Sequence, residues 1–183
     1  MSFGEKILDY KEDILKDLDE LLKIQSVSSK SQEDASEALK FILKRAEEMG
    51  LTTENVDDIA GHAEYGKGDE IAAVLSHVDV VPSGDGWSVE PFALTRKNGR
   101  LYGRGIADDK GPAIIALYCL KALKDSGVPF KRRLRTIFGA SEEVGMADMD
   151  RYFSKQPLPN MGFTPDLEYG ICNVEKGILR SEE

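Results

Sequence analysis

The chain has 183 residues, a formal net charge of −9 and an apolar content of 41%. This length fits one domain, and this composition can supply a normal core. The acidic balance argues against a nucleic-acid partner, because phosphate binding needs clustered Lys and Arg. No apolar run is long enough to span a membrane, and Met1–Lys6 lacks the apolar region of a signal peptide.

The two cysteines, Cys119 and Cys172, are far apart and form no C-x-x-C pattern. We interpret them as reduced core thiols of a cytoplasmic protein. The basic cluster Lys131–Arg135 leads into an apolar stretch. We therefore interpret it as the solvated entry to a strand.

Two helices are predicted near the N-terminus. Apolar residues recur at helical spacing over about residues 5–23, which indicates an amphipathic helix. Ser31 and Asp34 have the spacing of a capping box that would begin a second helix. Gly50 would end that helix.

Strands and helices alternate over the rest of the chain. Asn98-Gly99 is a strong hairpin turn, and Pro112 suits the first turn of a helix that runs to about Lys124. Another helix is expected at Ala147–Lys155, and a loop surrounds Trp87. Strands are expected at Thr52–Val56, Ala63–Tyr65, Ile71–Ser76, Phe92–Arg96, Arg100–Tyr102, Leu134–Ala140, Thr164–Glu168 and Ile171–Glu175. This alternation predicts an α/β domain.

Three short segments place a histidine or an acidic pair at the expected end of a strand. They are S-H-V-D-V-V-P at Ser76–Pro82, G-R-G-I-A-D-D-K-G at Gly103–Gly111 and A-S-E-E-V-G at Ala140–Gly145. Imidazole and carboxylate groups are zinc ligands. A pair of metals also needs a bridging carboxylate, and hydrolysis needs one more as base. The segments supply His77, Asp79, Asp108, Asp109, Glu142 and Glu143.

Two histidines stand two residues before an acidic residue. His77 and Asp79 would face the same way on a strand, so Asp79 can orient His77 or a neighbouring group. A satisfied core histidine beside a turn aspartate explains this pair equally well. His62 precedes Glu64 at the same offset, but no buried apolar run comes before it. We interpret His62 as a surface residue on an exposed strand.

The acidic residues each have an ordinary explanation when taken alone. A helix cap would explain one aspartate, at Asp108 or Asp109, but it would not explain both. The dinucleotide-binding motif G-x-G-x-x-G does not fit this segment, because it would need glycine at position 108, where the chain has an aspartate. Glu142 and Glu143 would be solvated charges in a first helical turn, or one would bind metal while the other faces substrate. Asp166 alone is an ordinary turn residue.

Together, in order and spacing, these segments resemble the di-zinc metallopeptidase family of glutamate carboxypeptidase, aminoacylase and succinyl-diaminopimelate desuccinylase. Within it the chain is most similar to the bacterial dipeptidase branch, the carnosinase-like Xaa-His dipeptidases. W-x-x-x-P-F and P-D-L-E add to the match, which reaches about Lys176. The resemblance implies a zinc-exopeptidase-like catalytic domain with a mixed, mostly parallel central sheet flanked by helices.

The resemblance also implies a ligand set for two zinc ions. His77 would bind the first zinc, and Asp166 would complete its protein ligands. Asp108 would bridge both ions, and Glu143 would bind the second. The peptide bond between Asp108 and Asp109 is expected to be cis.

The implied activity is zinc-dependent hydrolysis of a peptide bond in a small peptide, with dipeptides as the expected substrates. Metal-activated water would attack with Glu142 as general base, while Asp79 supports His77. One alternative is an N-acyl amino acid deacylase or desuccinylase. The other is a non-catalytic zinc-binding fragment. No nucleic-acid or membrane partner is expected.

The resemblance also divides the chain into 1–176, the N-terminal part of a catalytic domain, and 177–183, the start of a lid domain. The family's second zinc takes a late histidine from a chain more than twice as long, whereas only His62 and His77 occur here. We therefore expect this chain alone to be inactive. We also expect self-association, through the buried runs Ile71–Ser76 and Leu134–Ala140.

Overall fold

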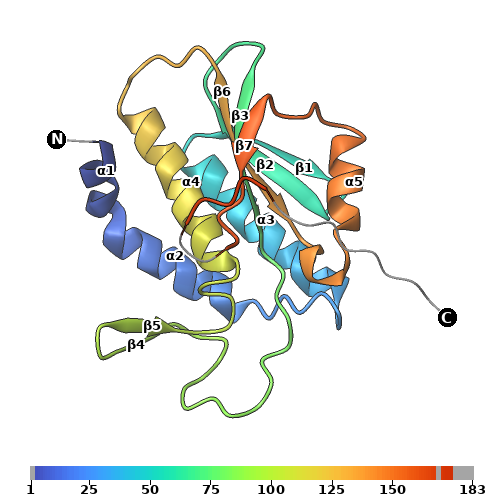
Figure 1. Cartoon of the computed structure of the whole chain (residues 1–183). Helices are drawn as coiled ribbons and strands as arrows, with labels where there is room; N and C mark the ends of the chain where they lie inside the picture. Colours follow the sequence, from blue (N-terminus) through green and yellow to red (C-terminus); the bar gives the residue numbers. More distant parts are fainter. Residues whose placement is uncertain (1–2, 168–169, 175–183) are drawn as a thin grey trace.

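The computed structural model describes residues 3–167 and 170–174 (Figure 1). The helical elements are α1 (Phe3–Lys6), the 3₁₀ turn η1 (Ile7–Tyr10), α2 (Lys11–Lys23), α3 (Gln32–Glu48), α4 (Lys110–Asp125), the 3₁₀ turn η2 (Glu142–Val144) and α5 (Ala147–Phe153). The strands are β1 (Thr52–Val56), β2 (Ala60–Tyr65), β3 (Ile71–His77), β4 (Thr95–Lys97), β5 (Arg100–Tyr102), β6 (Arg133–Gly139) and β7 (Met161–Phe163).

Five strands form the central sheet, in the order β1-β2-β6-β3-β7. β3 is parallel to both β6 and β7. β2 is antiparallel to β1 and β6, so four of the five strands point the same way. This confirms the predicted α/β class with a mixed, mostly parallel sheet between helices. β4 and β5 form a separate hairpin that extends from the body of the molecule (Figure 1).

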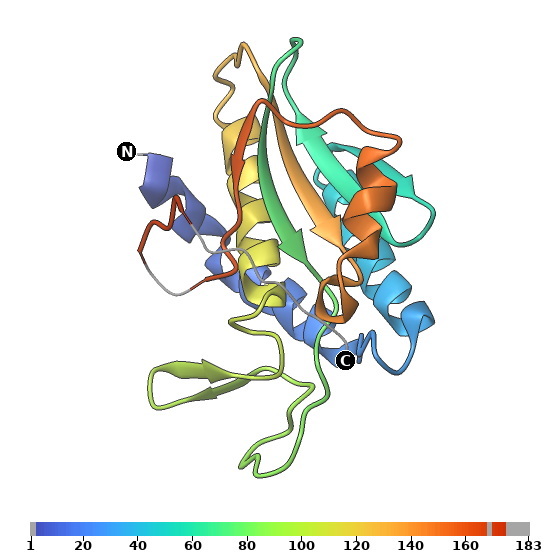
Figure 2. The same ribbon diagram turned by 45° about the vertical axis from the view of Figure 1, so that its right-hand side comes forward.

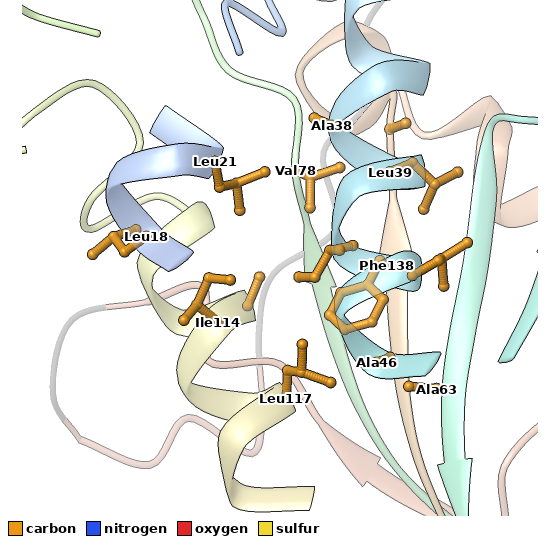
Figure 3. Packing of buried hydrophobic residues seen from close by; sticks show 14 of the residues in the cluster. Leu18, Leu21, Ala38, Leu39, Ala46, Ala63, Val78, Ile114, Leu117 and Phe138 are labelled. Carbon is orange, nitrogen blue, oxygen red and sulfur yellow. The ribbon is translucent and has the colours of Figure 1, made fainter. Parts of the chain in front are cut away.

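Helices cover both faces of the sheet (Figure 2). α3 and α4 lie on one face, where Leu39, Ile114 and Phe138 belong to the larger buried cluster (Figure 3). α5 lies on the other face, where Ile137 and Tyr152 belong to a smaller cluster. Successive residues of β6 therefore point into opposite cores, as the pleat of a strand requires.

Several local predictions are confirmed. The Ser31 hydroxyl accepts a hydrogen bond from the Asp34 amide at 3.1 Å and caps α3. Gly50 follows the end of this helix with a φ of +72°. Asn98 and Gly99 both have positive φ in the β4–β5 turn. The first predicted helix is not continuous, because the 3₁₀ turn at Ile7–Tyr10 interrupts it.

The strand predictions after α5 are wrong within the described residues. β7 lies at Met161–Phe163, where it pairs with β3, whereas residues 164–167 form no strand. Residues 171–174 form no strand either, and Glu168 and Glu175 lie outside the described residues. Short apolar runs predict a strand only where a neighbouring strand is available to pair with them.

The interpretation of the cysteines is only partly right. Neither Cys119 nor Cys172 is in a disulfide, but Cys119 is half-buried and Cys172 is exposed. Cys172 is therefore not a core thiol. Within residues 3–167 and 170–174, the helices are all too short or too polar to cross a membrane.

His62 is buried, with 3% of its surface exposed, so its interpretation as a surface residue is wrong. Its Nδ1 lies 2.8 Å from the hydroxyl of Tyr152. Arg135 donates to the same hydroxyl at 3.1 Å and pairs with Glu64 at 2.7 Å. Arg135 is buried too, so the basic cluster is not fully solvated. The burial of His62 follows from the position of β2, which contacts both α3 and α5, and no apolar run in the sequence marks this strand as covered.

Burial of His62, followed by the nearby Arg135 charge, lowers the pKa of its imidazole from 6.5 to about 3. The folded state thus keeps His62 neutral where the unfolded state is already protonated. Stability from this residue is present above pH 6.5 and is lost as the pH falls toward 3, by up to about 1.4 kcal/mol per pH unit.

We expect wild type to lose free energy of unfolding more steeply between pH 6.5 and pH 4 than a His62→Gln variant. Glutamine can still accept from Tyr152 but does not titrate. Urea denaturation at several pH values measures the free energy of unfolding of both proteins. The carboxylates are common to both, so their contribution cancels when the two are compared. Equal slopes for the two proteins would contradict the prediction.

The strand order of the sheet changes which strand is expected to mediate self-association. β3 and β6 lie inside the sheet, so the two runs named from the sequence are not its edges. The edge beside β3 is the short strand β7, whose Met161 and Phe163 are exposed. Hollows of about 370 and 230 Å³ lie beside this strand, both lined in part by Phe163. Among the described residues no further strand pairs with β7, and an unpaired apolar edge invites pairing with another chain.

We therefore expect the 183-residue chain to self-associate through β7. Light scattering over a concentration series should show a rising mean mass, and Met161→Lys should lower it, because an edge charge opposes strand pairing. A monodisperse monomer at all concentrations would refute this expectation.

Candidate metal centre

The site is formed where the parallel strands end. β3 ends at His77, β6 at Gly139 and β7 at Phe163, and all three strands point the same way. The residues that follow bring Asp79, Glu142 and Asp166 to this edge. The turn before α4 adds Asp108. In open α/β sheets, the carboxyl ends of the strands are the usual place for a ligand.

The imidazole of His77 is at the centre of this group, with a side chain only 4% exposed. Its Nδ1 lies 3.0 Å from the backbone oxygen of Asp79, which orients the ring and leaves Nε2 toward the carboxylates. Nε2 is 3.0 Å from Asp108, 3.5 Å from Asp166 and 3.9 Å from Glu142. The ordinary reading as a satisfied core histidine does not explain three carboxylates around one nitrogen.

Asp79 lies beneath the site and is fully buried. One carboxylate oxygen is 3.3 Å from Nδ1 of His77. The two oxygens accept hydrogen bonds from the amides of Glu142 and Glu143, both at 3.2 Å. Asp79 therefore orients the histidine and the acidic turn together, which extends the supporting role expected from its sequence position.

The four predicted metal residues come together with Glu142, the expected general base, as two overlapping groups. His77, Glu142 and Asp166 form one, and His77, Asp108 and Glu143 form the other, with the ligand atoms of each group within 4.8 Å of one another. The side chain of Asp108 is 65% exposed, so the site is open to solvent on that side.

The two aspartates before α4 have different surroundings. The peptide bond between Asp108 and Asp109 is cis, as expected from the resemblance. Asp108 reaches the site, whereas Asp109 is fully buried and accepts a hydrogen bond from the amide of His77 at 3.0 Å. The two adjacent carboxylates therefore make different contacts, and the side chain of Asp109, the N-cap residue of α4, makes no capping hydrogen bond.

The electrostatics of the group favour a bound cation. Burial raises the pKa values of Glu142, Glu143 and Asp166 above the ordinary range, and neighbouring carboxylates raise them further. Burial alone would lower the pKa of His77, but Asp79 and the other carboxylates raise it to about 10. Within the described residues, no Lys or Arg pairs with these site carboxylates. One imidazole and four carboxylates without a basic partner fit a divalent metal.

Two buried residues near the site were not predicted from the sequence. Lys110 is fully buried, and its ammonium donates to the backbone oxygens of Leu21 and Ile24 at 2.9 and 2.7 Å. Burial lowers the pKa of Lys110 to about 7. Asp148 is 1% exposed and accepts hydrogen bonds from backbone amides beside Glu142. Lys110 directly follows the acidic pair in the sequence, and this position could have indicated a residue near the site. No sequence feature indicates a role for Asp148, because it resembles a solvated charge at a helix start.

The comparison with protein families matches residues 73–183 to peptidase family M20/M25/M40. Among curated proteins, "Putative dipeptidase YtjP" of Bacillus subtilis is 42% identical over 187 residues, covering 98% of this chain and 40% of that protein. A Staphylococcus aureus protein, "Putative dipeptidase SAUSA300_1697", is 42% identical over 182 residues, covering 95% of this chain and 39% of its own length. The chain thus spans about two fifths of the relatives it matches.

Solved structures show the same fold. Human carnosine dipeptidase 1 aligns with a TM-score of 0.73 at 24% identity, over 91% of this chain and 41% of that one. The dipeptidase Dug1p of Saccharomyces cerevisiae aligns with a TM-score of 0.70 at 26% identity, over 84% of this chain and 37% of that one.

Proposed function

Because the chain belongs to peptidase family M20/M25/M40, we propose that it carries the metal centre of a zinc-dependent dipeptidase. The observation that carries this proposal is the pair of overlapping ligand groups that share His77. The names of the curated relatives support peptides, and dipeptides in particular, as the substrate class.

The proposed roles are those that the family resemblance implies, and the clustering of the side chains around His77 supports them. His77 and Asp166 would hold one zinc, Glu143 would hold a second, and Asp108 would serve as the carboxylate shared by both. Bound zinc would lower the pKa of a water molecule and polarise a substrate carbonyl. Each ligand comes from a different segment, so the folded sheet is required to assemble the centre.

Glu142 is the proposed general base. Its carboxylate faces His77 at 3.9 Å, is 35% exposed and can therefore reach both the site and solvent. It takes a proton from the attacking water and later gives it to the leaving amine, which balances the hydrolysis. Asp79 supports this step by holding the amides of Glu142 and Glu143.

Residues 1–176 are proposed to form the N-terminal part of the catalytic domain, with 177–183 leading into a lid. Residues 175–183 lie outside the described residues. The chain spans about two fifths of the relatives' length, and we propose that the 183-residue chain alone has little activity.

Metal removal tests the proposed activity. In a chain as long as the relatives that contains these residues, a chelator should abolish hydrolysis of a dipeptide panel, and zinc should restore it. The same panel should include N-acyl amino acids, because preference for these would indicate a deacylase. Hydrolysis that persists in metal-free protein would overturn the proposal.

A further inference from the structure

The two glutamates of the site lie on a single short 3₁₀ turn. η2 spans only Glu142–Val144, and Gly145 and Met146 after it both have positive φ. A single 3₁₀ turn has few hydrogen bonds of its own to fix its orientation. Contacts from outside the turn must therefore define where Glu142 and Glu143 point.

Two buried carboxylates supply these contacts. The amides of Ala140 and Ser141 donate to Oδ2 of Asp148, at 2.8 and 3.0 Å. The next two amides, of Glu142 and Glu143, donate to Asp79. Ala140 shares its amide with the backbone oxygen of Ile59, so the Ser141 amide is the one that depends on Asp148 alone. Four consecutive amides thus bind two carboxylates at the entry to the turn.

The contacts of Asp148 connect the turn to α5. Its Oδ1 accepts from the amide of Met149 at 2.9 Å, and its own amide donates to the Ser141 hydroxyl at 3.3 Å. Within the described part of the chain, no Lys or Arg pairs with this carboxylate. A buried carboxylate without a cationic partner is costly for stability, unless hydrogen bonds compensate it. Three backbone amides compensate the Asp148 carboxylate, and two of them, of Ala140 and Ser141, belong to the chain that leads into the turn.

Gly139 makes this arrangement possible. A Cβ at this position would lie 2.5 Å from Oδ2 of Asp148, closer than side chains approach one another. The φ of Gly139 is not positive, so the requirement is for space and not for an unusual backbone. The last residue of β6 and the second residue of α5 are thus fitted to each other.

We propose that Asp148 is a positioning residue for the metal centre: its buried carboxylate holds the start of the Ser141–Val144 turn so that Glu143 reaches the metal and Glu142 faces the substrate side. The roles of the two glutamates rest on the proposed function. The hydrogen-bonded turn and the fit with Gly139 do not. Asp148 acts through the backbone and touches no reacting atom.

Zinc titration of the 183-residue chain tests the proposal. Asp148→Ala should weaken zinc binding about 10-fold, the lower range for groups that orient metal ligands. Gly139→Ala should do the same, because the added methyl group displaces the carboxylate. The double variant should bind zinc no more weakly than either single variant, because the two substitutions remove the same interaction. Additive losses would overturn the fit between Gly139 and Asp148.

Asp17→Ala is the matched control. Asp17 is also a fully buried carboxylate, but it pairs with Arg45 and Tyr118 away from the site. It should destabilise the fold and leave zinc affinity unchanged in folded protein. Asp148→Asn should retain most of the affinity, because its oxygen can still accept from Ser141. If folded Asp148→Ala binds zinc like wild type, Asp148 has a structural role only and the proposal is overturned.

Amide exchange gives a readout that does not depend on metal. In Asp148→Ala, the amides of Glu142 and Glu143 should exchange at least about 10-fold faster than in Asp17→Ala, although Asp148 does not contact them. Unchanged exchange would overturn the positioning role. If wild type and His77→Ala bind zinc equally, the proposed metal site fails instead, while faster exchange would still support the role of Asp148 in the turn.

Discussion

Replacement of Glu142 by glutamine should lower turnover by about 10²- to 10⁴-fold, the usual contribution of a general base. The amide cannot accept the proton from water, yet it has nearly the same shape and leaves the Asp79 contacts to the backbone in place. Metal content should stay near that of the parent protein. The experiment needs a chain of the relatives' length, assayed for dipeptide hydrolysis, with zinc measured in the same samples.

Glu143→Gln is the matched control, since it makes the same change one residue along the chain. It should lose zinc as well as activity, because the family resemblance assigns Glu143 to the metal and Glu142 to the proton transfer, although both glutamates lie in the ligand groups around His77. If Glu142→Gln loses zinc and Glu143→Gln retains it, the roles of the two residues have been exchanged.

Replacement of His77 by alanine should weaken the tightest zinc site of the 183-residue chain by more than about 100-fold. Groups that only orient ligands already account for 10- to 100-fold, and His77 belongs to both ligand groups. Wild type should bind about one zinc more tightly than a second, because the late histidine of the family is not among its residues. Calorimetric titration of metal-free protein measures both affinities.

His62→Ala is the control for removal of an imidazole. His62 is the other histidine of the chain, and it is equally buried but bonded to Tyr152. That variant should lose stability without losing zinc. Equal zinc binding by wild type and His77→Ala would refute the assignment of His77 as a ligand.

Much of the site could be predicted because its residues are contiguous in short segments. His77 with Asp79 and Asp108 with Asp109 each follow a recognisable strand or precede a helix. The parallel pairing of β3 with β6 then brings the carboxyl ends of both strands to the same edge of the sheet. This pairing explains why His77 and Asp79 meet Glu142 and Glu143. Asp108 comes from the turn before α4 and Asp166 from the residues after β7, and the strand expected near Asp166 was wrong.

The remaining features depend on contacts between distant parts of the chain. His62 is buried by Tyr152, which lies 90 residues later, and Arg135 by its pairing with Glu64. A local pattern cannot show that a polar strand will be covered on both faces. Asp148 looks like a surface charge in its short helix, whereas its burial, its hydrogen bonds to the amides of Ala140 and Ser141 and its fit against Gly139 are visible only in the fold.

The buried ammonium of Lys110 has a consequence for where the functional unit begins. The family match starts at residue 73, yet the acceptors of Lys110 are the carbonyls of Leu21 and Ile24 at the end of α2. A chain shortened to the matched region would leave this group without acceptors, two residues from Asp108. It would have to lose its proton or pull the turn toward solvent. Helix α2 therefore supports the turn that carries Asp108 in the proposed metal centre, and a domain boundary drawn from the family match alone would remove this support.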